Sequence, residues 1–467
     1  MSRINPILNA DSYKLGHFLQ YPPATQAISG YITTRGASMR PEVVFFGLQV
    51  FLKEYLSQPI TAIDIAEAED LAGLHGQPFD RAGWQHILNA HGGFLPLRIE
   101  ALPEGVFVHR GVPMVQVVNT DPACFWLTSY IETALLRAIW YPSTVASSLR
   151  QVKQTLMPYL KTSCDDPDGI IATRLYDYGA RGATSLEQAG LGGLATLLHF
   201  DNTDTLEAIV YARRYYGAKM AGFSMPASEH TTMISWPQRE EQLSFANMVD
   251  QFGDYPSYSV VSDSYDIHNA VSELWGKTLQ QKVRSKPGTL IVRPDSGDPI
   301  DVPVQTVVQL AYHFGTRLNT KGYKVLDDKV RVLQADGVSL RDITMILGRL
   351  EGMGFSAENI AFGIGASQLQ KINRSIYSFT MKCSALMDGE GRWRDISRRP
   401  VTIHERMPDV GRRAVVLEAG EFASVRLEDL GKRENHLKPV WENGRLLHEH
   451  SFDEVRARAR IKRRMDF

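Results

Sequence analysis

Three short apolar runs in this 467-residue chain each stop at arginine, aspartate or glycine residues. The runs lie at residues 289–298, 330–337 and 360–366. In the first, Pro294 fixes the backbone φ angle and Gly297 permits a left-handed step, so the chain must turn there. The turn would bring Arg293, Asp295 and Asp298 to the carboxyl end of a buried strand, where α/β folds bind ligands. We therefore expect a site for a phosphorylated sugar.

Acidic residues near these strand ends are candidates for binding ribose or metal. Asp263 and Asp266 stand where an apolar run gives way to a helical pattern, so taken alone an aspartate here is more simply a helix cap. Asp295 and Asp336 each end a strand, where aspartate is disfavoured and its burial is costly. Such a pair could bind vicinal ribose hydroxyls, or Mg²⁺ between phosphates. Simple turn formation remains the alternative for both.

Glycines and basic residues could hold the phosphate groups. Gly363 to Ser367 leads into a helical pattern that we expect to end at Lys371 and Arg374. The N-terminus of a helix offers backbone N–H groups to a phosphate. A basic cluster follows at 392–399, although each of its arginines could simply be surface charge.

Two tyrosines and an arginine, Tyr176, Tyr178 and Arg181, stand at a further expected strand end. Core packing is the alternative role for each tyrosine. The neighbouring glycines allow close backbone approach, and for that reason we favour a binding role. The sequence has no P-loop, no complete dinucleotide-binding fingerprint and no Gly-x-Ser-x-Gly elbow, so these common alternatives are set aside.

Composition indicates a soluble enzyme of about two domains. Hydrophobic residues make up 43% of the chain and charged residues 22%, and the formal net charge of −1 gives no reason to expect nucleic acid as a partner. Cys124, Cys164 and Cys383 lie far apart, which argues against a disulfide framework or a zinc site of ordinary spacing. No secretory signal or membrane-length apolar stretch is present, so we expect a cytoplasmic protein.

The apolar patterns predict a mixed α/β chain. Expected elements before residue 170 are a helix from about Gly47, antiparallel strands within 95–118, and helical structure over 125–160 interrupted near Pro142. Strands then alternate with helices, as in a parallel sheet or barrel. The six expected strands are 170–175, 197–200, 258–262, 289–293, 330–334 and 360–363. The expected helices are 184–193, 204–216, 264–274, 301–313 and 339–352. Six strands favour an irregular barrel over an eight-fold one. The last part would be strand-like and end in a helix at 452–464.

Many segments together resemble the nicotinamide phosphoribosyltransferase family. The matching motifs include Asp11-Ser-Tyr13, Gln20-Tyr-Pro-Pro, Phe46-Gly-Leu-Gln, Tyr178-Gly-x-Arg181-Gly, Gly217-Ala-Lys, Pro226-Ala-Ser-Glu-His230, Val261-Ser-Asp-Ser-Tyr-Asp-Ile, Arg293-Pro-Asp-Ser-Gly, Asn359-Ile-Ala-Phe-Gly and Ser451-Phe-Asp-Glu. The resemblance covers nearly the whole chain. It implies a type II phosphoribosyltransferase fold, in which an irregular α/β barrel (171–374) carries the active site. A second α/β domain would combine 1–170 with 375–467.

The family reaction joins nicotinamide to phosphoribosyl diphosphate, giving nicotinamide mononucleotide and diphosphate in NAD salvage. The resemblance implies a homodimer with shared active sites, in which Tyr178 and Tyr13 of the partner subunit sandwich the pyridine ring. Asp204 would accept a hydrogen bond from the carboxamide, and Arg181 would also lie at this site. The residues matched to ribose and phosphate binding are Asp336, Ala335, Gly365, Ala366, Arg374, Lys382, Arg35 and Arg398. Asp295 would also lie near Mg²⁺.

A histidine and its neighbours would couple ATP to the reaction. By resemblance, ATP phosphorylates His230, and Asp263 orients the imidazole ring. His230, Asp263 and Arg293 would all lie around the diphosphate. A tunnel would lead from the pyridine pocket. Its matched residues are Tyr176, Ser224, Met225, Ser259, Ile291, Arg331 and Leu333.

The sequence departs from the family pattern at four positions. Ala335 and Ala366 stand where relatives usually carry glycine, so the backbone would approach ribose and phosphate more tightly. Tyr176 replaces a common histidine and Met225 a smaller valine, which predicts a narrower tunnel and weaker binding of elongated tunnel inhibitors.

Three other functions stay open at this stage. The related nicotinate phosphoribosyltransferases would prefer the acid to the amide. A catalytically silent homologue would act as a binding protein, although the matched acidic, histidine and arginine positions argue against it. An unrelated phosphate-binding barrel, such as an isomerase, would need an acid–base pair that we cannot assign.

Overall fold

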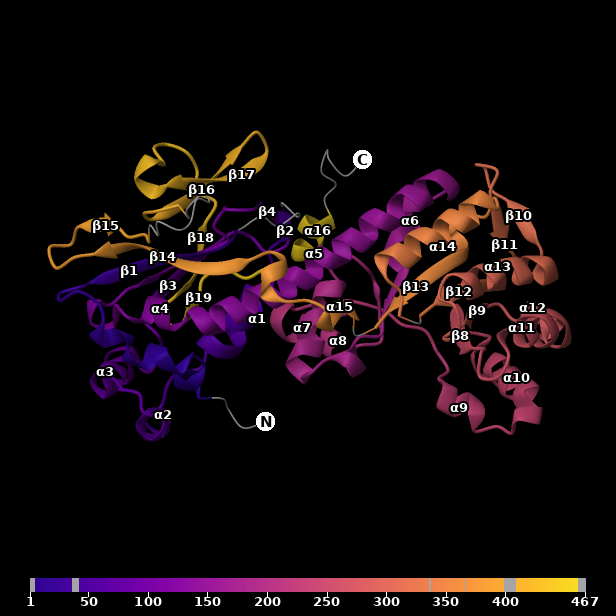
Figure 1. Cartoon of the computed structure of the whole chain (residues 1–467), viewed down its shortest axis with the longest axis horizontal. Helices are drawn as coiled ribbons and strands as arrows, with labels where there is room; N and C mark the ends of the chain where they lie inside the picture. The colour runs from indigo at the N-terminus through magenta and orange to yellow at the C-terminus, as the bar shows by residue number, and fades with distance from the viewer. Residues whose placement is uncertain (1–4, 36–41, 336, 366, 399–408, 461–467) are drawn as a thin grey trace. The chain divides into compact units, whose positions relative to one another are not determined.

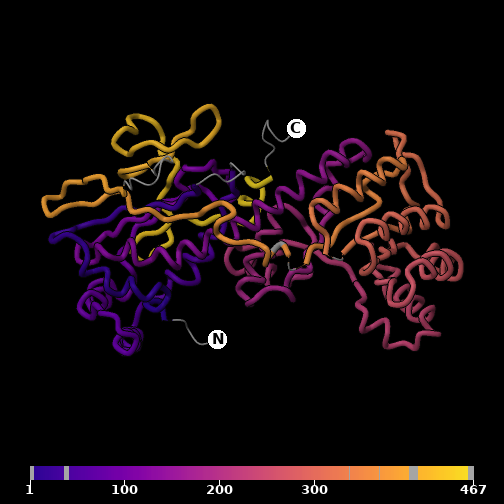
Figure 2. Tube along the Cα trace, in the orientation of Figure 1, coloured from indigo at the N-terminus to yellow at the C-terminus, as the bar shows by residue number. Residues whose placement is uncertain are grey.

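The computed structural model describes residues 5–35, 42–335, 337–365, 367–398 and 409–460, which form two compact units. Unit 1 takes its residues from Met1–Ser147, Arg214–Ala218 and Ile372–Ile461, and unit 2 from Ser148–Arg213 and Lys219–Lys371. Figure 2 shows indigo and orange segments side by side in unit 1, so both ends of the chain build it. The domain limits predicted from the sequence, 1–170, 171–374 and 375–467, stay a prediction.

Unit 1 is built on a seven-stranded sheet with the order β15-β14-β1-β5-β3-β18-β19. Its strands are β1 (Ala27–Thr34), β3 (Leu97–Ala101), β5 (Val115–Asn119), β14 (Phe379–Met387), β15 (Trp393–Asp395), β18 (Lys438–Glu442) and β19 (Arg445–Leu446). All eight residues of β1 are buried, because this strand lies at the centre of the unit. Two further antiparallel pairs are formed by β2 (Glu42–Val44) with β4 (Phe107–His109) and by the hairpin of β16 (Arg413–Glu418) with β17 (Glu421–Arg426).

Helices complete unit 1. They are α1 (Leu48–Phe51), α2 (Ala62–Leu74), α3 (Arg81–His91), α4 (Leu127–Tyr130), the first half of α5 (Glu132–Ser163) and α16 (Phe452–Arg460). The predicted helix near Gly47, the strands within 95–118 and the C-terminal helix are thus confirmed over the described residues.

Unit 2 is built on a curled sheet of six parallel strands with the order β7-β6-β13-β12-β9-β8 (Figure 1). The strands are β6 (Leu175–Asp177), β7 (Asn202–Thr203), β8 (Ser257–Val261), β9 (Thr289–Arg293), β12 (Val330–Gln334) and β13 (Ile360–Ile364). A separate pair joins β10 (Thr316–Leu318) to β11 (Lys324–Leu326). The sheet covers only part of a barrel, which confirms the predicted irregular α/β barrel joined to a second α/β unit.

Helices follow most strands of unit 2 and cover one face of the sheet. They are α6 (Pro167–Ile170), α7 (Leu186–Thr196), α8 (Leu206–Tyr216), α9 (His230–Ile234), α10 (Glu241–Phe252), α11 (Ile267–Asn269), α12 (Gln280–Ser285), α13 (Asp301–Phe314), α14 (Leu340–Gly352) and α15 (Ser367–Gln370). Val292, Val332 and Phe362 are 0% exposed, because their face of the sheet is fully covered.

Four of the six predicted strands are confirmed and two were placed wrongly. Residues 170–175 fall largely in helical turns, because Asp166 caps α6 and Pro167 starts it. Residues 197–200 form the end of a turn after α7, and the neighbouring strand β7 begins at Asn202. Both runs are too short for periodicity to separate buried helix from buried strand.

The predicted interruption at Pro142 was also wrong, since α5 runs through it without a break. Proline removes one backbone N–H and crowds the carbonyl four residues earlier, here that of Ala138. Gly47 lies directly against this place, and the Ser143 hydroxyl accepts the Phe46 N–H at 3.0 Å and donates to the Phe46 carbonyl at 3.0 Å. Packing of the segment before α1 therefore supports the helix at its weakest point.

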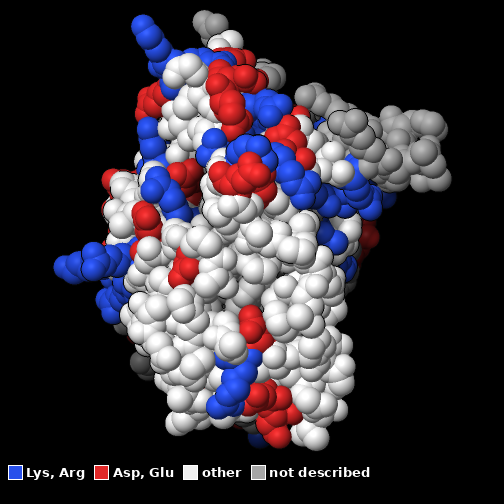
Figure 3. Space-filling model, turned by 90° about the vertical axis from the view of Figure 1, so that its left-hand side faces the viewer, with Lys and Arg blue, Asp and Glu red and all other residues white. Residues whose placement is uncertain are grey.

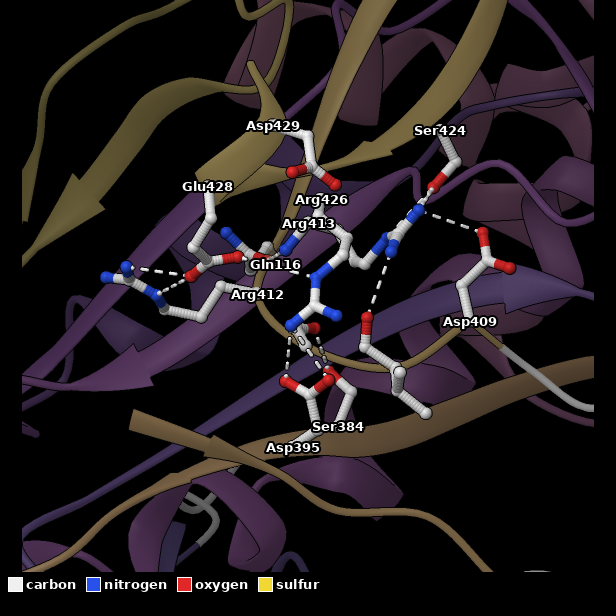
Figure 4. Close-up of polar contacts among 12 residues, drawn as sticks. Gln116, Ser384, Asp395, Asp409, Arg412, Arg413, Ser424, Arg426, Glu428 and Asp429 are labelled. Carbon is white, nitrogen blue, oxygen red and sulfur yellow. Dashed lines mark hydrogen bonds and ion pairs between the residues drawn. The ribbon is translucent and has the colours of Figure 1, made fainter. Parts of the chain in front are cut away.

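Arginines of β16 and β17 are held by acids within unit 1 (Figure 4). Arg413 donates to Asp409 at 2.9 Å and to Ser424, and Arg426 pairs with Asp395 at 2.8 Å. On the face drawn in Figure 3, basic and acidic side chains are likewise intermixed over its upper half.

Within the described residues, no helix is both long and apolar enough to cross a membrane.

Replacing Gly47 should destabilise the protein strongly. Its φ angle is +104°, and an added Cβ would lie 2.4 Å from Pro142 Cγ and 2.7 Å from the Ala138 carbonyl oxygen. Left-handed backbone costs about 1–2 kcal/mol and overpacking about 1–3 kcal/mol, so Gly47→Ala should lower the unfolding free energy by about 2–5 kcal/mol. Urea denaturation measures the change.

Gly111 provides the matched control, because its φ angle is +89° and its added Cβ would meet open space. Gly111→Ala should therefore lower the unfolding free energy by only about 1–2 kcal/mol, the cost of a left-handed backbone at a residue with a side chain. Equal losses for the two variants would contradict the packing of Gly47 on α5.

Candidate active site

Strand register places five of the seven predicted tunnel residues, and Arg293, on one face of the unit 2 sheet, which we name the inner face. Side chains alternate across a strand, so residues paired between strands share a face. The inner-face residues, in strand order, are Asn202, Tyr176, Ala361 and Gly363, Arg331 and Leu333, Ile291 and Arg293, and Ser259 and Val261. Tyr178, Asp204, Ala335, Asp263, Asp295 and Gly365 follow at the carboxyl ends of the same strands.

Two tyrosine rings stand at the β6 end of this face. The rings of Tyr176 and Tyr178 are 6.3 Å apart between centroids and tilted by only 10°. Gly363 lets the Tyr178 ring approach, because a Cβ there would lie 2.9 Å from that ring and 2.8 Å from the Ala335 methyl. Burial raises the pKa of Tyr178, and the charge of Asp204 raises it further. The hydroxyl therefore stays protonated, and the ring offers a neutral flat surface.

Asp204 lies beside these rings with an exposed carboxylate. Its Oδ1 accepts a hydrogen bond from the Ser224 hydroxyl. The neighbouring Met225 Sδ accepts from the Tyr176 hydroxyl at 3.9 Å and from Ser257 at 3.5 Å. The structure thus brings together one carboxylate, two stacked rings and two of the predicted tunnel residues.

Asp177 positions both sides of this pocket and was missed by the sequence analysis. Its Oδ1 accepts the Gly179 N–H at 2.8 Å, and its Oδ2 accepts the Thr203 hydroxyl at 2.9 Å. Its carbonyl accepts the Asp204 N–H at 2.9 Å. Burial raises the pKa of Asp177, whereas these hydrogen bonds lower it. An aspartate inside a strand is unusual, and that was the available signal.

A second cluster joins three chain segments around His230, at the start of α9. His230 Nε2 lies 3.6 Å from Asp263 Oδ1 and 3.6 Å from Asp295 Oδ2, and Nδ1 lies 3.3 Å from the Ser264 hydroxyl. The His230 side chain is 43% exposed and that of Asp263 only 3%. The imidazole is therefore open to a ligand, and two carboxylates lie beside it.

Asp263 is not the helix cap that its position suggested. Its Oδ2 accepts the Asp295 N–H at 2.9 Å and the Ser296 hydroxyl, so it holds the turn after β9. Asp266 caps α11 instead. Asp298 likewise has a local role, since its carboxylate accepts the N–H groups that begin α13.

Arg293 lies between the tyrosine pocket and the histidine cluster. Its Nη2 donates to the Ser228 carbonyl at 2.9 Å, and its charge lowers the pKa of Tyr178. Within the described residues, the buried atoms Arg293 Nε, Asp263 Oδ1 and Ser259 Oγ have no hydrogen-bond partner. Buried polar atoms without partners are costly, so three of them along one face indicate a polar ligand.

Arg331 and Leu333 lie on the same face but offer no free polar group there. The Arg331 guanidinium donates to the carbonyl of Asp327, before β12, at 2.9 Å and to that of Val330, the first residue of β12, at 2.7 Å. Leu333 is 0% exposed. Ile291 is half-buried between Ser259 and Arg331.

Unit 1 holds a separate group of cations. Burial lowers the pKa of Lys382 on β14, and the positive charges of Arg35 and Arg398 lower it further. Three cations gathered in this way favour an anion as their partner. Arg374 is exposed and donates to the Phe379 carbonyl at 2.7 Å. Tyr13 is 56% exposed.

The remaining predicted site residues make few contacts or lie outside the described residues. Arg181 is exposed on a short turn after Tyr178, and Gly365 faces open space. Asp336 and Ala366 lie outside the described residues. The expected phosphate-binding helix does not reach Lys371, because α15 ends at Gln370 after one turn.

Comparison with known proteins agrees with this geometry. Residues 173–442 match the nicotinate phosphoribosyltransferase (NAPRTase) family, and residues 5–99 match the nicotinamide phosphoribosyltransferase N-terminal domain. A protein of Xanthomonas campestris named nicotinamide phosphoribosyltransferase is 43% identical, over 97% of this chain and 98% of its own. One of the same name from Acinetobacter baylyi is 31% identical over 98% and 97%.

Solved structures show the same fold at lower identity. Nicotinate-nucleotide pyrophosphorylase from Pyrococcus furiosus has a TM-score of 0.60 at 17% identity, covering 98% of this chain and 97% of its own. Human nicotinic acid phosphoribosyltransferase has a TM-score of 0.58 at 18% identity, covering 96% and 92%.

Replacing Gly363 tests the packing of the Tyr178 ring. The added methyl of Gly363→Ala must displace the ring or the Ala335 methyl, so the unfolding free energy should fall by about 1–3 kcal/mol. Gly365→Ala is the matched control, because its methyl meets open space, and it should stay within about 0.5 kcal/mol. Denaturant melts report both, and indistinguishable values would refute the contact.

Proposed function

Since this chain belongs to the nicotinate phosphoribosyltransferase family and is therefore a pentosyltransferase, we propose that its acceptor is nicotinamide. The reaction joins the pyridine nitrogen to C1 of the ribose of phosphoribosyl diphosphate while the bond from C1 to diphosphate breaks. The products are nicotinamide mononucleotide and diphosphate, as in NAD salvage. The observation that carries this choice is the exposed carboxylate of Asp204 beside two neutral tyrosine rings.

The chemistry requires positioning more than proton transfer. The pyridine nitrogen is already unprotonated at neutral pH, so no general base has to act on it. The enzyme must hold the ring, stabilise a ribose centre that becomes positive, and neutralise the departing diphosphate. Stacking on Tyr178 is worth roughly 1–3 kcal/mol, by analogy with bases on aromatic side chains.

Asp204 favours the amide over the acid. A nicotinate carboxylate at about 4 Å from Asp204 would cost about 4 kcal/mol at an effective dielectric near 20. A carboxamide N–H in the same place would instead donate a hydrogen bond. This energy difference corresponds to roughly a thousandfold preference for nicotinamide over nicotinate, because Asp204 repels the acid.

Arg293 and Asp295 would serve the ribose and diphosphate end. The unpartnered Nε of Arg293 can donate to a phosphate oxygen. Asp295, whose side chain is 30% exposed, offers the oxygen ligands that Mg²⁺ prefers. When bound with the diphosphate, the ion would offset its negative charge. Asp336 is proposed to bind the ribose hydroxyls by resemblance alone.

By resemblance we also propose that the cations gathered in unit 1 bind phosphate. Lys382, Arg35 and Arg398 already gather without substrate, which supports an anion as their ligand. By family resemblance we also propose a homodimer, in which Tyr13 of the partner subunit stacks on the second face of the pyridine ring. The exposed ring of Tyr13 supports that role.

ATP would enter through His230. One imidazole nitrogen would attack the γ-phosphate, forming a P–N bond as the bond to ADP breaks, and water would later release phosphate from the histidine. The openness of the imidazole and its two carboxylate neighbours support this step. We further propose that Tyr176 and Met225 narrow the tunnel, supported by the contact between their side chains.

Removing the charge of Asp204 should change the choice between the two vitamin forms. Asp204→Asn should lower the ratio of kcat/KM for nicotinamide over nicotinate by up to about a thousandfold, because the repulsion disappears. Glu207→Gln, which removes a carboxylate three residues away, should leave the ratio unchanged. Steady-state rates with both acceptors give it, and an unaltered ratio in Asp204→Asn would favour nicotinate phosphoribosyl transfer instead.

Removing the imidazole of His230 should abolish ATP coupling. The enzyme incubated with ATP labelled at the γ-phosphate should carry acid-labile label, and His230→Ala should carry none. His268→Ala, which removes an exposed histidine on α11, should label normally. Undiminished labelling of His230→Ala would exclude the proposed phosphohistidine.

A further inference from the structure

Four side chains of the type that binds transition metals meet in unit 1, where α3 contacts the turn after β5. His86 and His91 belong to α3, and Asp121 and Cys124 belong to the turn Asp121–Cys124. The Nε2 atoms of both histidines lie 2.7 Å from the same oxygen, Asp121 Oδ2. None of these residues has a place in the proposed phosphoribosyl transfer.

The ligand atoms are close enough for a single ion to bind several of them. His86 Nε2, an Asp121 carboxylate oxygen and Cys124 Sγ all lie within 4.8 Å of one another. A tetrahedral zinc site has bonds of about 2.0–2.3 Å to such ligands, so its ligand atoms lie roughly 3.3–3.8 Å apart. Small side-chain rotations would reach that spacing.

The backbone already fixes the two ligands on the turn. Asp121 Oδ1 accepts the Ala123 N–H at 2.9 Å, which leaves Oδ2 directed toward the histidines. Cys124 is 0% exposed and forms no disulfide, so its thiol is protected from oxidation at the surface. The edge-on contact of Trp84 with Trp126, at 4.7 Å between centroids, packs the same helix against the residues that follow this turn.

We propose that His86, Asp121 and Cys124 bind one Zn²⁺ ion, which links α3 to the turn after β5, while His91 holds the Asp121 carboxylate through its hydrogen bond. The ligand set contains the imidazole, carboxylate and thiolate groups that zinc prefers. A carboxylate and a thiolate together supply two negative charges, which balance a divalent ion in a partly buried place. With three protein ligands, a water molecule would complete the tetrahedral coordination of the ion.

Metal titration of the tag-free full-length protein tests the site. The protein is first treated with a chelator, which is then removed, and zinc is titrated back. Elemental analysis should then find one Zn²⁺ per chain, and the bound zinc should raise the thermal unfolding temperature. Co²⁺ bound in its place should give an intense near-ultraviolet charge-transfer band, which requires a thiolate ligand. This measurement on the unaltered chain does not depend on any variant folding.

Variants assign the ligands. His86→Ala should weaken zinc binding more than about a hundredfold, beyond the roughly tenfold to hundredfold cost of losing an outer hydrogen-bond partner. Cys124→Ser should abolish the charge-transfer band. His75→Ala and Cys164→Ser, which alter an exposed histidine and a buried free cysteine elsewhere, should leave binding unchanged.

Three results would overturn the proposal. Absence of stoichiometric zinc binding would show that the four side chains form only a hydrogen-bonded cluster. A Co²⁺ spectrum without the thiolate band, or zinc binding equally strong in His86→Ala, would place the ion elsewhere.

Discussion

The register of the six parallel strands is the constraint on which the candidate active site depends. Side chains alternate across each strand, so a slip of one residue in any pair would turn that strand's ligand residues toward the covering helices. The observed pairing instead puts Tyr176, Ile291 and Ser259 on one face, with the aspartates at the strand ends above them. The apolar residues on the opposite face, such as Val292 and Val332, are fully buried and hold the register in place.

Two buried carboxylates convert this register into precise local geometry. Asp177 ties the turn that carries Tyr178 to the residue before Asp204, and Asp263 ties the turn after β9 to the end of β8. Neither needs to touch a substrate for the site to depend on it. Arg293 Nε and Asp263 Oδ1 are buried without hydrogen-bond partners, and the proposed substrate could supply them. The protein thus satisfies its own scaffold and leaves the ligand-facing atoms open.

Sequence reasoning predicted what local patterns determine. Apolar runs followed by Arg, Asp or Gly residues correctly located the four strands β8, β9, β12 and β13. Sequence reasoning failed where tertiary contacts determine the local structure. The predicted break at Pro142 is absent, because Gly47 and Ser143 support α5 there. Asp177 was missed because its role needs β6 and β7 to pair. The His86–Asp121 cluster was missed because its residues are 35 positions apart in sequence and follow no ordinary zinc spacing. Family resemblance, rather than pattern, supplied the choice of substrate.

The most direct test of the account is a crystal structure of the enzyme with nicotinamide bound. The account predicts the pyridine ring stacked on Tyr178, with the carboxamide nitrogen within hydrogen-bond distance of an Asp204 carboxylate oxygen. A ring bound away from Tyr178, or a carboxamide pointing away from Asp204, would contradict it.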